Sequence, residues 1–159
     1  MAWVIRPVDT AKAHRLVPLL EQVQAIHAAA HPDIFKAPSD PDALLAEIRQ
    51  MLGQEGTTAL LAVGEDGSSL GYAICGIRLI EPTPLIHGRK VGVLHHISVE
   101  RACRRQGIGL ALVEAAKARL REQGITRMQA SYWAFNDASA GLMRKAGLAP
   151  SGLWTEGPL

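Results

Sequence analysis

The chain has 159 residues, of which 48% are hydrophobic, and a formal net charge of +2; this length supports one hydrophobic core but not two, so we expect a single domain spanning residues 1–159. The small charge and the scattered basic residues exclude a nucleic-acid partner, and the lack of a long apolar run excludes a membrane span. Because two cysteines give no disulfide framework and the first residues lack the apolar core of a signal peptide, we expect a cytoplasmic protein, with homodimer formation left open.

The chain begins with a predicted strand and a predicted helix. Residues 2–6 have the composition of a strand, which the following proline ends. Asp9 or Thr10 then caps a helix that extends to about Ala30. Pro18 breaks or kinks this helix, because proline removes a backbone donor and clashes with the preceding turn.

A second helix and a hairpin follow. Ser39 or Asp40, with a proline next to it, begins a helix over residues 42–52 that carries an apolar stripe. Residues 57–63 and 69–80 predict two antiparallel strands, because an Asp-Gly turn lies between them.

The segment from residue 91 to residue 120 predicts a strand, a glycine-bearing turn and a helix. β-Branched residues recur at period two over residues 91–99, and an apolar stripe over residues 110–120 indicates a helix that Gly124 ends. Gly107 and Gly109 start this helix and leave unpaired N–H groups at the positive end of its dipole, with two arginines just before them. This arrangement is an anion site that suits phosphate.

The spacing of the turn excludes two common phosphate sites. A P-loop needs a Gly-Lys-Ser/Thr sequence, which is missing here, and a dinucleotide fingerprint needs a third small residue where Leu112 stands. The remaining pattern, Arg104-x-x-Gly107-x-Gly109 after a strand, resembles the pyrophosphate-binding loop of the GNAT superfamily of acyl-CoA-dependent N-acyltransferases.

A second segment at the distance expected for this family strengthens the resemblance. Residues 128–133 alternate like a strand, Asn136 opens the next helix, Ser139 is the small residue three places later, and Gly147 ends the helix. Asparagine is also a good helix N-cap, so capping alone explains Asn136, and only the upstream loop favours a cofactor role.

The fold that this resemblance implies is α/β (α+β). It is a twisted mixed sheet, mainly antiparallel, flanked by helices in the order β-α-α-β-β-β-α-β-α-β. Residues 151–159 would form the last short strand or a tail.

The resemblance also implies acetyl-CoA as cosubstrate. In that fold the central strand and the strand after the pyrophosphate helix splay apart, and the pantetheine lies along the central strand. Glycine is needed in the loop because a Cβ would obstruct phosphate oxygens. The implied cofactor-binding residues are Ile97, Ser98, Val99, Arg104, Arg105, Gln106, Gly107, Ile108, Gly109, Leu110, Asn136 and Ser139.

The implied reaction transfers an acetyl group from a thioester to an amine, which requires a base for the amine proton. His95 and His96 are the candidates, because imidazole titrates near neutrality. Strand alternation sends them to opposite faces, with His95 on the face of Ile97 and Val99. His95 is preferred, and the arylalkylamine acetyltransferases of this superfamily are similar in placing a histidine here. A bulge would reverse the choice, and a hydrogen-bonded core histidine is the alternative.

The group that protonates the leaving thiolate is less clear from the sequence. Many members of the family place a tyrosine seven residues after the asparagine, where this chain has Met143, and a thioether cannot donate a proton. Tyr132 or a water would take this role, the thiolate would leave unprotonated, or catalysis is weak or absent. A non-catalytic acyl-CoA-binding or regulatory module is therefore the alternative function.

The amine acceptor is the least specified partner. The resemblance places it against the first two helices and the loop before the central strand. The candidate residues are His27, His31 and Phe35, with Gln24, Asp33 and residues 87–90, and an ordinary surface position is the simpler explanation for any one of them. Small amines, amino acids, polyamines, aminoglycosides and protein N-termini all remain open. No histidine spacing suits a metal, so no metal is predicted.

Overall fold

A computed structural model describes residues 2–37 and 40–159. Five strands form one sheet in the order β1-β2-β3-β4-β5. The first four pair antiparallel, and β5 runs parallel to β4, which confirms the predicted mixed and mainly antiparallel sheet. The strands are β1 (Trp3–Val8), β2 (Thr58–Gly64), β3 (Ser69–Ile80), β4 (Arg89–Val99) and β5 (Met128–Ala130).

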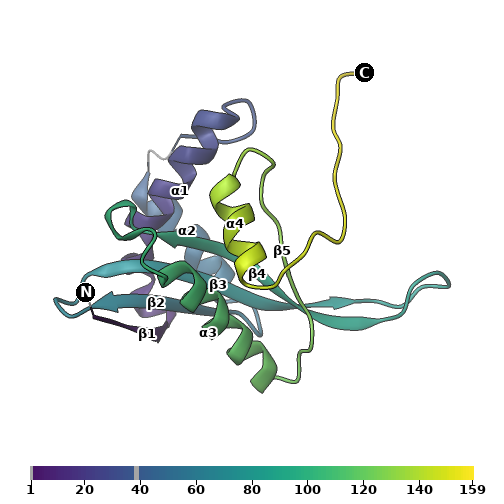
Figure 1. Ribbon diagram of the computed structural model, residues 1–159, viewed down its shortest axis with the longest axis horizontal. Coiled ribbons are helices and arrows are strands. Elements are labelled where there is room, and N and C mark those ends of the chain that lie inside the picture. The colour runs from purple at the N-terminus through teal and green to yellow at the C-terminus, as the bar shows by residue number, and fades with distance from the viewer. Residues whose placement is uncertain (1, 38–39) are drawn as a thin grey trace.

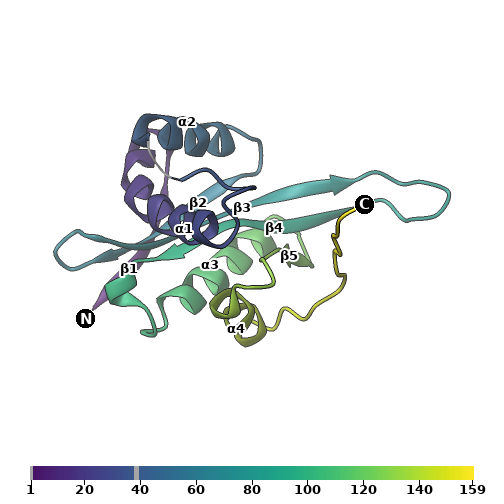
Figure 2. The same cartoon turned by 90° about the horizontal axis from the view of Figure 1, so that it is seen from above.

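Helices cover both faces of the sheet. The helices α1 (Val17–Ala30) and α2 (Pro41–Leu52) lie on one face, and α3 (Ile108–Glu122) and α4 (Asp137–Lys145) lie on the other (Figures 1 and 2). Each face has its own apolar cluster. Buried side chains of α1 and α2 pack on the even-numbered Tyr72 and Ile74 of β3, whereas α3 packs on the odd-numbered Ala73 and Cys75 and on Leu70, which the register shift against β2 leaves unpaired. This follows from strand alternation, which points successive side chains to opposite faces.

One of the two predicted proline effects is wrong and the other is confirmed. Strand β1 continues through Pro7, because β1 is an edge strand and can tolerate a missing donor. The helix predicted to begin at Asp9 or Thr10 is interrupted at Pro18, as expected. Residues Thr10–Leu16 form a separate 3-10 helix, capped by Asp9, and α1 starts at Val17, with the proline in its first turn, where no N–H is needed.

The caps and turns elsewhere in the N-terminal half agree with the prediction. Asp40 caps α2, because its carboxylate accepts hydrogen bonds from the N–H groups of Asp42 and Ala43 at 3.0 and 3.2 Å. Ser39, the alternative cap, lies outside the described residues. The β2–β3 turn contains Gly67 at a φ of 82°, which favours glycine.

Strand β4 contains a β-bulge at His95. Ile74 of β3 pairs with His96, but the next residue, Cys75, pairs with Leu94, so His95 is the extra residue on β4. The bulge divides the β-branched run that the sequence predicts to form one face. After the bulge the odd-numbered residues Ile97 and Val99 pack toward α3, whereas before the bulge the even-numbered Leu94 packs on that face.

The C-terminal part is less regular than predicted. Strand β5 has three residues instead of six, and its pairing with β4 stops at Leu94, next to the bulge. Residues 151–159, all of which the structure describes, form no strand. This tail contains two glycines and a proline, which weaken strands. No helix in the described ranges is long and apolar enough to cross a bilayer.

Candidate active site

Among the described residues, no strand pairs with the edge of β4 beyond Leu94 on the β5 side, and we call this edge the notch. The N–H group of Glu100 donates to the carbonyl of Leu70 at 2.8 Å, on the β3 side. Because backbone groups alternate along a strand, those of Ile97 and Val99 point the other way, into the notch. The notch therefore offers main-chain hydrogen-bonding groups to an extended ligand.

Ser98 does not point into the notch. Its side chain is only 6% exposed, and its hydroxyl donates to the carbonyl of Leu19 in α1 at 2.9 Å. Its backbone has the parity of Glu100 and points to β3. Of the three strand residues expected to bind the pantetheine, the geometry therefore leaves Ile97 and Val99 as candidates.

A short 3-10 helix, Arg101–Cys103, and a four-residue loop connect the end of β4 to the N-terminus of α3. Its N-cap, Gly107, has a φ of 84°, and Arg105 has a φ of 65°, which is unusual for a residue with a side chain. A Cβ on Gly107 would meet no atom within 4 Å, so its backbone conformation requires glycine there. A Cβ on Gly109 would lie 3.4 Å from Leu142 Cδ2, which is an ordinary contact, so packing against α4 does not by itself require glycine there. The predicted reason, that a Cβ would obstruct phosphate oxygens, stays a prediction.

The loop before α3 is exposed and basic. Arg104 and Arg105 are both exposed, as is Gln106. The Nε atom of Arg104 donates to the carbonyl of Val99 at 3.1 Å, which ties the loop to the end of β4. The unpaired N–H groups at the start of α3, together with these two charges, suit an anion.

A cavity of about 590 Å³ lies where β4 and β5 separate and is bordered by α1, α2 and α4. It brings together residues that the sequence analysis assigns to three different roles. The cofactor candidates in its wall are Ile97, Asn136 and Ser139, the catalytic candidates are His95 and Tyr132, and the acceptor candidates are His27 and Phe35. The loop over residues 104–110 is not among the described residues that line it.

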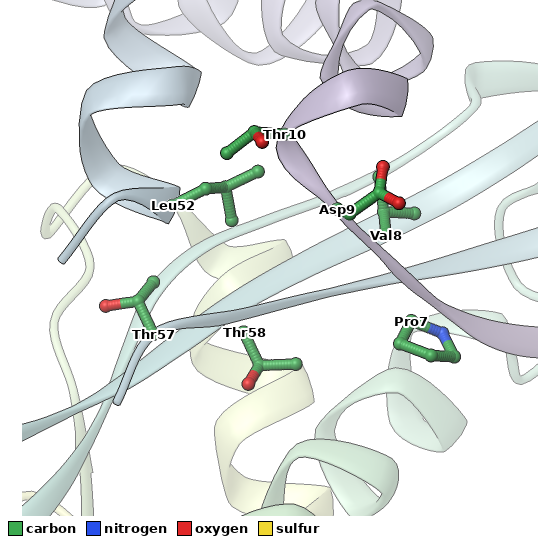
Figure 3. Close-up of a pocket in the computed structure, with 7 residues that line it drawn as sticks. All are labelled: Pro7, Val8, Asp9, Thr10, Leu52, Thr57 and Thr58. Atoms are coloured by element: carbon green, nitrogen blue, oxygen red, sulfur yellow. The ribbon is translucent and has the colours of Figure 1, made fainter. Parts of the chain in front are cut away.

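A second hollow, of about 430 Å³, lies between the end of β1 and the start of β2 (Figure 3). None of the predicted site residues lines it, within the described part of the chain. Its one carboxylate, Asp9, accepts a hydrogen bond from the Lys12 N–H group as a helix cap. This hollow is therefore not a candidate active site.

The two histidines of β4 lie on the same side of the sheet. A Cβ on Gly76 would lie 2.9 Å from His95 Nε2 and 3.0 Å from Thr57 Oγ1, so the imidazole lies over this glycine on the α1 and α2 face. His96 Nδ1 lies 3.5 Å from the hydroxyl oxygen of Tyr72 on that face. The predicted placement on opposite faces is wrong, because the bulge inserts one residue and interrupts alternation.

Both imidazoles are in an environment that favours the neutral form. Burial lowers the pKa of His95, and the Arg78 charge lowers it further. Burial also lowers the pKa of His96, with smaller contributions from the neighbouring His95 and His27. His95 is the more exposed of the pair and lines the cavity. A neutral, accessible imidazole can accept a proton from a substrate amine.

The groups on the α4 side differ in what they can donate. Met143 is 3% exposed and lines the cavity with a thioether. Tyr132, which carries a hydroxyl group, is 40% exposed and lines the same cavity. Asn136 caps α4, because its side-chain oxygen accepts from the Ser139 N–H group at 3.0 Å. The capping explanation for Asn136 is therefore correct, and its cofactor role stays a prediction.

An aromatic cluster joins the end of α1 to the loop after β5. His27 stacks on Phe35 with ring centroids 4.9 Å apart, and Trp133 lies 5.1 Å from both His31 and Phe35. Phe135 completes this cluster. The sequence analysis identified the three α1-side members but missed both loop members. The signal in the sequence that could have identified them is that both are aromatic and lie just before Asn136.

The other acceptor candidates are placed differently. The amide nitrogen of Gln24 donates to the carbonyl of Lys36 at 2.7 Å, and both residues line the cavity. Asp33 and residues 87–90 are not in the described wall of the cavity. The loop that contains residues 81–88 projects at the far end of the long β3–β4 hairpin (Figure 1). In the described part of the chain, no group of three histidine, cysteine or acidic side chains could hold a metal ion.

The Acetyltransferase (GNAT) family model matches residues 20–148, which is well over half of the chain. The chain belongs to the GNAT acetyltransferase family. A comparison of the GNAT chain with curated proteins finds no significant match.

Solved structures show the same fold at low sequence identity. A mutant of the BH1408 protein from Bacillus halodurans superimposes with a TM-score of 0.87 and 21% identity, covering 98% of this chain and 99% of that chain. The aminoglycoside 6'-N-acetyltransferase AAC(6')-Ih from Acinetobacter baumannii gives 0.73 and 19%, covering 99% of both chains. AAC(6')-Iy in complex with the bisubstrate analogue CoA-S-monomethyl-acetylneamine gives 0.76 and 18%, covering 100% of this chain and 99% of that chain.

Proposed function

We propose that the protein is an N-acetyltransferase that moves an acetyl group from acetyl-CoA to a primary amine. The observation that carries this proposal is the notch, an unpaired strand edge that begins at the His95 bulge and ends beside the N-terminus of α3. Membership of the GNAT family supports it, as does the CoA analogue bound by the similar protein AAC(6')-Iy. A cytoplasmic location and a homodimer stay predictions from the sequence.

The residues present fit acetyl-CoA as cosubstrate. The backbone groups of Ile97 and Val99 would bind the pantetheine along the notch. The pyrophosphate would bind at the N-terminus of α3, where Gly107 exposes the N–H groups of the first turn and the loop arginines add charge. Backbone groups of β4 and α3 would thus contribute to CoA binding as much as the side chains of the loop arginines.

His95 would act as the general base of the transfer. It would remove one proton from the substrate ammonium, and the neutral nitrogen would then attack the thioester carbonyl carbon. A C–N bond forms, the C–S bond breaks, and its electron pair goes to sulfur. Tyr132 would donate its hydroxyl proton to the sulfur and recover one from the nitrogen. The products are the amide, the CoA thiol and one proton that His95 releases to solvent.

The cosubstrate is tested by its effect on the free energy of unfolding. CoA at 100 times its dissociation constant should add about 2.7 kcal/mol to that free energy, while ATP and NAD should add nothing. Release of CoA thiol from acetyl-CoA, measured across a panel of amines, then tests the transfer. Equal stabilisation by all three ligands would contradict the proposed cosubstrate.

A non-catalytic acyl-CoA-binding module is the second candidate function. The buried thioether of Met143 favours it, because this wall of the cavity lacks a proton donor at that position. Met143→Tyr and the matched variant Met143→Phe separate the two functions, since they differ by one hydroxyl group. If the protein is an enzyme, Met143→Phe should be active, and Met143→Tyr should release thiol at a higher rate. Thiol release that is absent in the unmodified protein while CoA still binds would favour the module.

A further inference from the structure

The acceptor side of the cavity has walls that are mainly aromatic and apolar. Phe35 and Trp133 meet at an interplanar angle of 79° and both line the cavity, so they form a corner of two flat surfaces. Leu20, Val23 and Leu44 from α1 and α2 also line it. A flat apolar group fits such a corner, because ring faces and edges attract one another.

The formal charges in the cavity wall are few. Two carboxylates, Asp40 and Glu47, and one ammonium group, Lys36, line it, which gives a net charge of −1. The carboxylate of Asp40 already accepts the hydrogen bonds that cap α2. Burial lowers the pKa of each of the lining histidines, so they add no compensating positive charge near pH 7. The wall therefore balances about one positive charge of a ligand.

This balance distinguishes between classes of amine. An aminoglycoside or a polyamine carries several ammonium groups, and each one that loses water needs a carboxylate or another acceptor as partner. A corner of aromatic rings supplies no such partners, although a ring face attracts a single cation. A ligand with one ammonium group on an apolar body satisfies both the charge and the shape of this wall.

We infer that the acceptor is a small amine with a single positive charge and a flat, apolar body, held by Phe35, Trp133 and the carboxylates of the cavity wall. This inference rests on the proposed function only in that the bound amine would be acetylated. Binding itself does not depend on the transfer. The acceptor class differs from the aminoglycosides named for two of the similar structures.

Calorimetry on the full chain saturated with CoA tests the acceptor class. 2-Phenylethylamine should bind at least tenfold more tightly than neamine. Trp133→Ala should weaken the binding of 2-phenylethylamine at least tenfold and leave that of CoA unchanged. The matched control is Trp154→Ala, since Trp154 is 94% exposed in the tail and should have no effect. 2-Phenylethanol, which lacks the charge, should bind more weakly than the amine, and Glu47→Gln should reduce that difference.

Thiol release from acetyl-CoA, measured with the same two amines, separates the acceptor class from the proposed function. Tight binding of 2-phenylethylamine, with no thiol released from acetyl-CoA in the presence of either amine, would overturn the transfer and support the acceptor class. Turnover and tighter binding of neamine would overturn the acceptor class and support the transfer. No measurable binding of 2-phenylethylamine, or equal binding in Trp133→Ala, would also overturn the acceptor class.

Discussion

His95 illustrates how one residue of a strand can change the side on which a functional group lies. The bulge removes His95 from the pairing with β3, and its imidazole lies over Gly76 beside the Thr57 hydroxyl. A sequence pattern with period two cannot indicate this position, because a bulge changes the parity of every later residue. The choice of His95 stays a prediction, and its support is now that His95 is the more exposed of two imidazoles that both line the cavity.

His95→Ala tests the proposed base. We expect the turnover number to fall by about 10² to 10⁴, because the amine proton loses its acceptor, while the affinity for CoA stays nearly unchanged. The loss should be smaller at high pH, where the amine deprotonates without help. Steady-state kinetics and CoA titration measure both quantities, and His87→Ala, in the projecting hairpin loop, is the control. An unchanged turnover number would transfer the role to His96 or to a water.

Gly76→Ala tests whether the glycine provides space for the imidazole. The added methyl group would lie 2.9 Å from His95 Nε2, which is too close, so the ring must move away from its position. We expect a large loss of turnover with little change in CoA affinity or in melting temperature, because only the end of a side chain is displaced. Gly141→Ala is the matched control, since its methyl group would meet nothing within 4 Å. Equal turnover in the two variants would contradict this role.

At the scale of elements, the sequence predicted best where one local signal decided the structure. The α3 helix and the β2–β3 hairpin were predicted close to their observed bounds, because a helical stripe and an Asp-Gly turn are local. The short β5 was not, since its end depends on where β4 bulges away from it. The aromatic cluster was only half predicted, because its two parts are a hundred residues apart in the chain and no periodicity connects them.

The two ends of α3 allow a matched test of the anion site. Gly107 and Gly124 both have positive φ, 84° and 75°, and a Cβ on either would meet nothing within 4 Å. Alanine at either position should therefore lower stability by a similar amount, of the order of 1 kcal/mol. Only Gly107→Ala should also weaken CoA, at least tenfold by calorimetry, because it disturbs the N–H groups that would bind the pyrophosphate. Equal loss of CoA affinity in both variants would contradict an anion site at the start of α3, because it would mean that the stability of the whole helix determines CoA binding.

At the scale of the whole molecule, the two faces of the sheet contribute differently to the site. Both faces hold an apolar cluster, but the α3 face supplies the helix N-terminus for the anion, while the α1 face holds the histidines. The cavity lies where these contributions meet, at the point where β4 and β5 part. A ligand that spans the notch and the cavity would thus contact segments from both halves of the chain.

Three histidines on the α1 face should make the fold sensitive to acid. Burial lowers the pKa values of His27, His95 and His96 below the usual value of about 6.5. Between the lowered values and pH 6.5 the unfolded chain binds more protons than the folded chain. The contribution of these histidines to the free energy of unfolding should therefore be fully present above about pH 6.5, and the free energy should decrease as the pH falls below that value.

Thermal melts at pH 7.5, 6.5 and 5.5 measure this dependence, and the melting temperature should fall toward the lowest pH. His96→Gln should reduce the dependence most, because His96 is the most deeply buried of the three and its glutamine replacement does not titrate. His87→Gln is the control, since it changes an exposed histidine outside the cavity wall. A melting temperature that stays constant from pH 7.5 to 5.5, or an unchanged slope in His96→Gln, would contradict the assignment of acid sensitivity to this face.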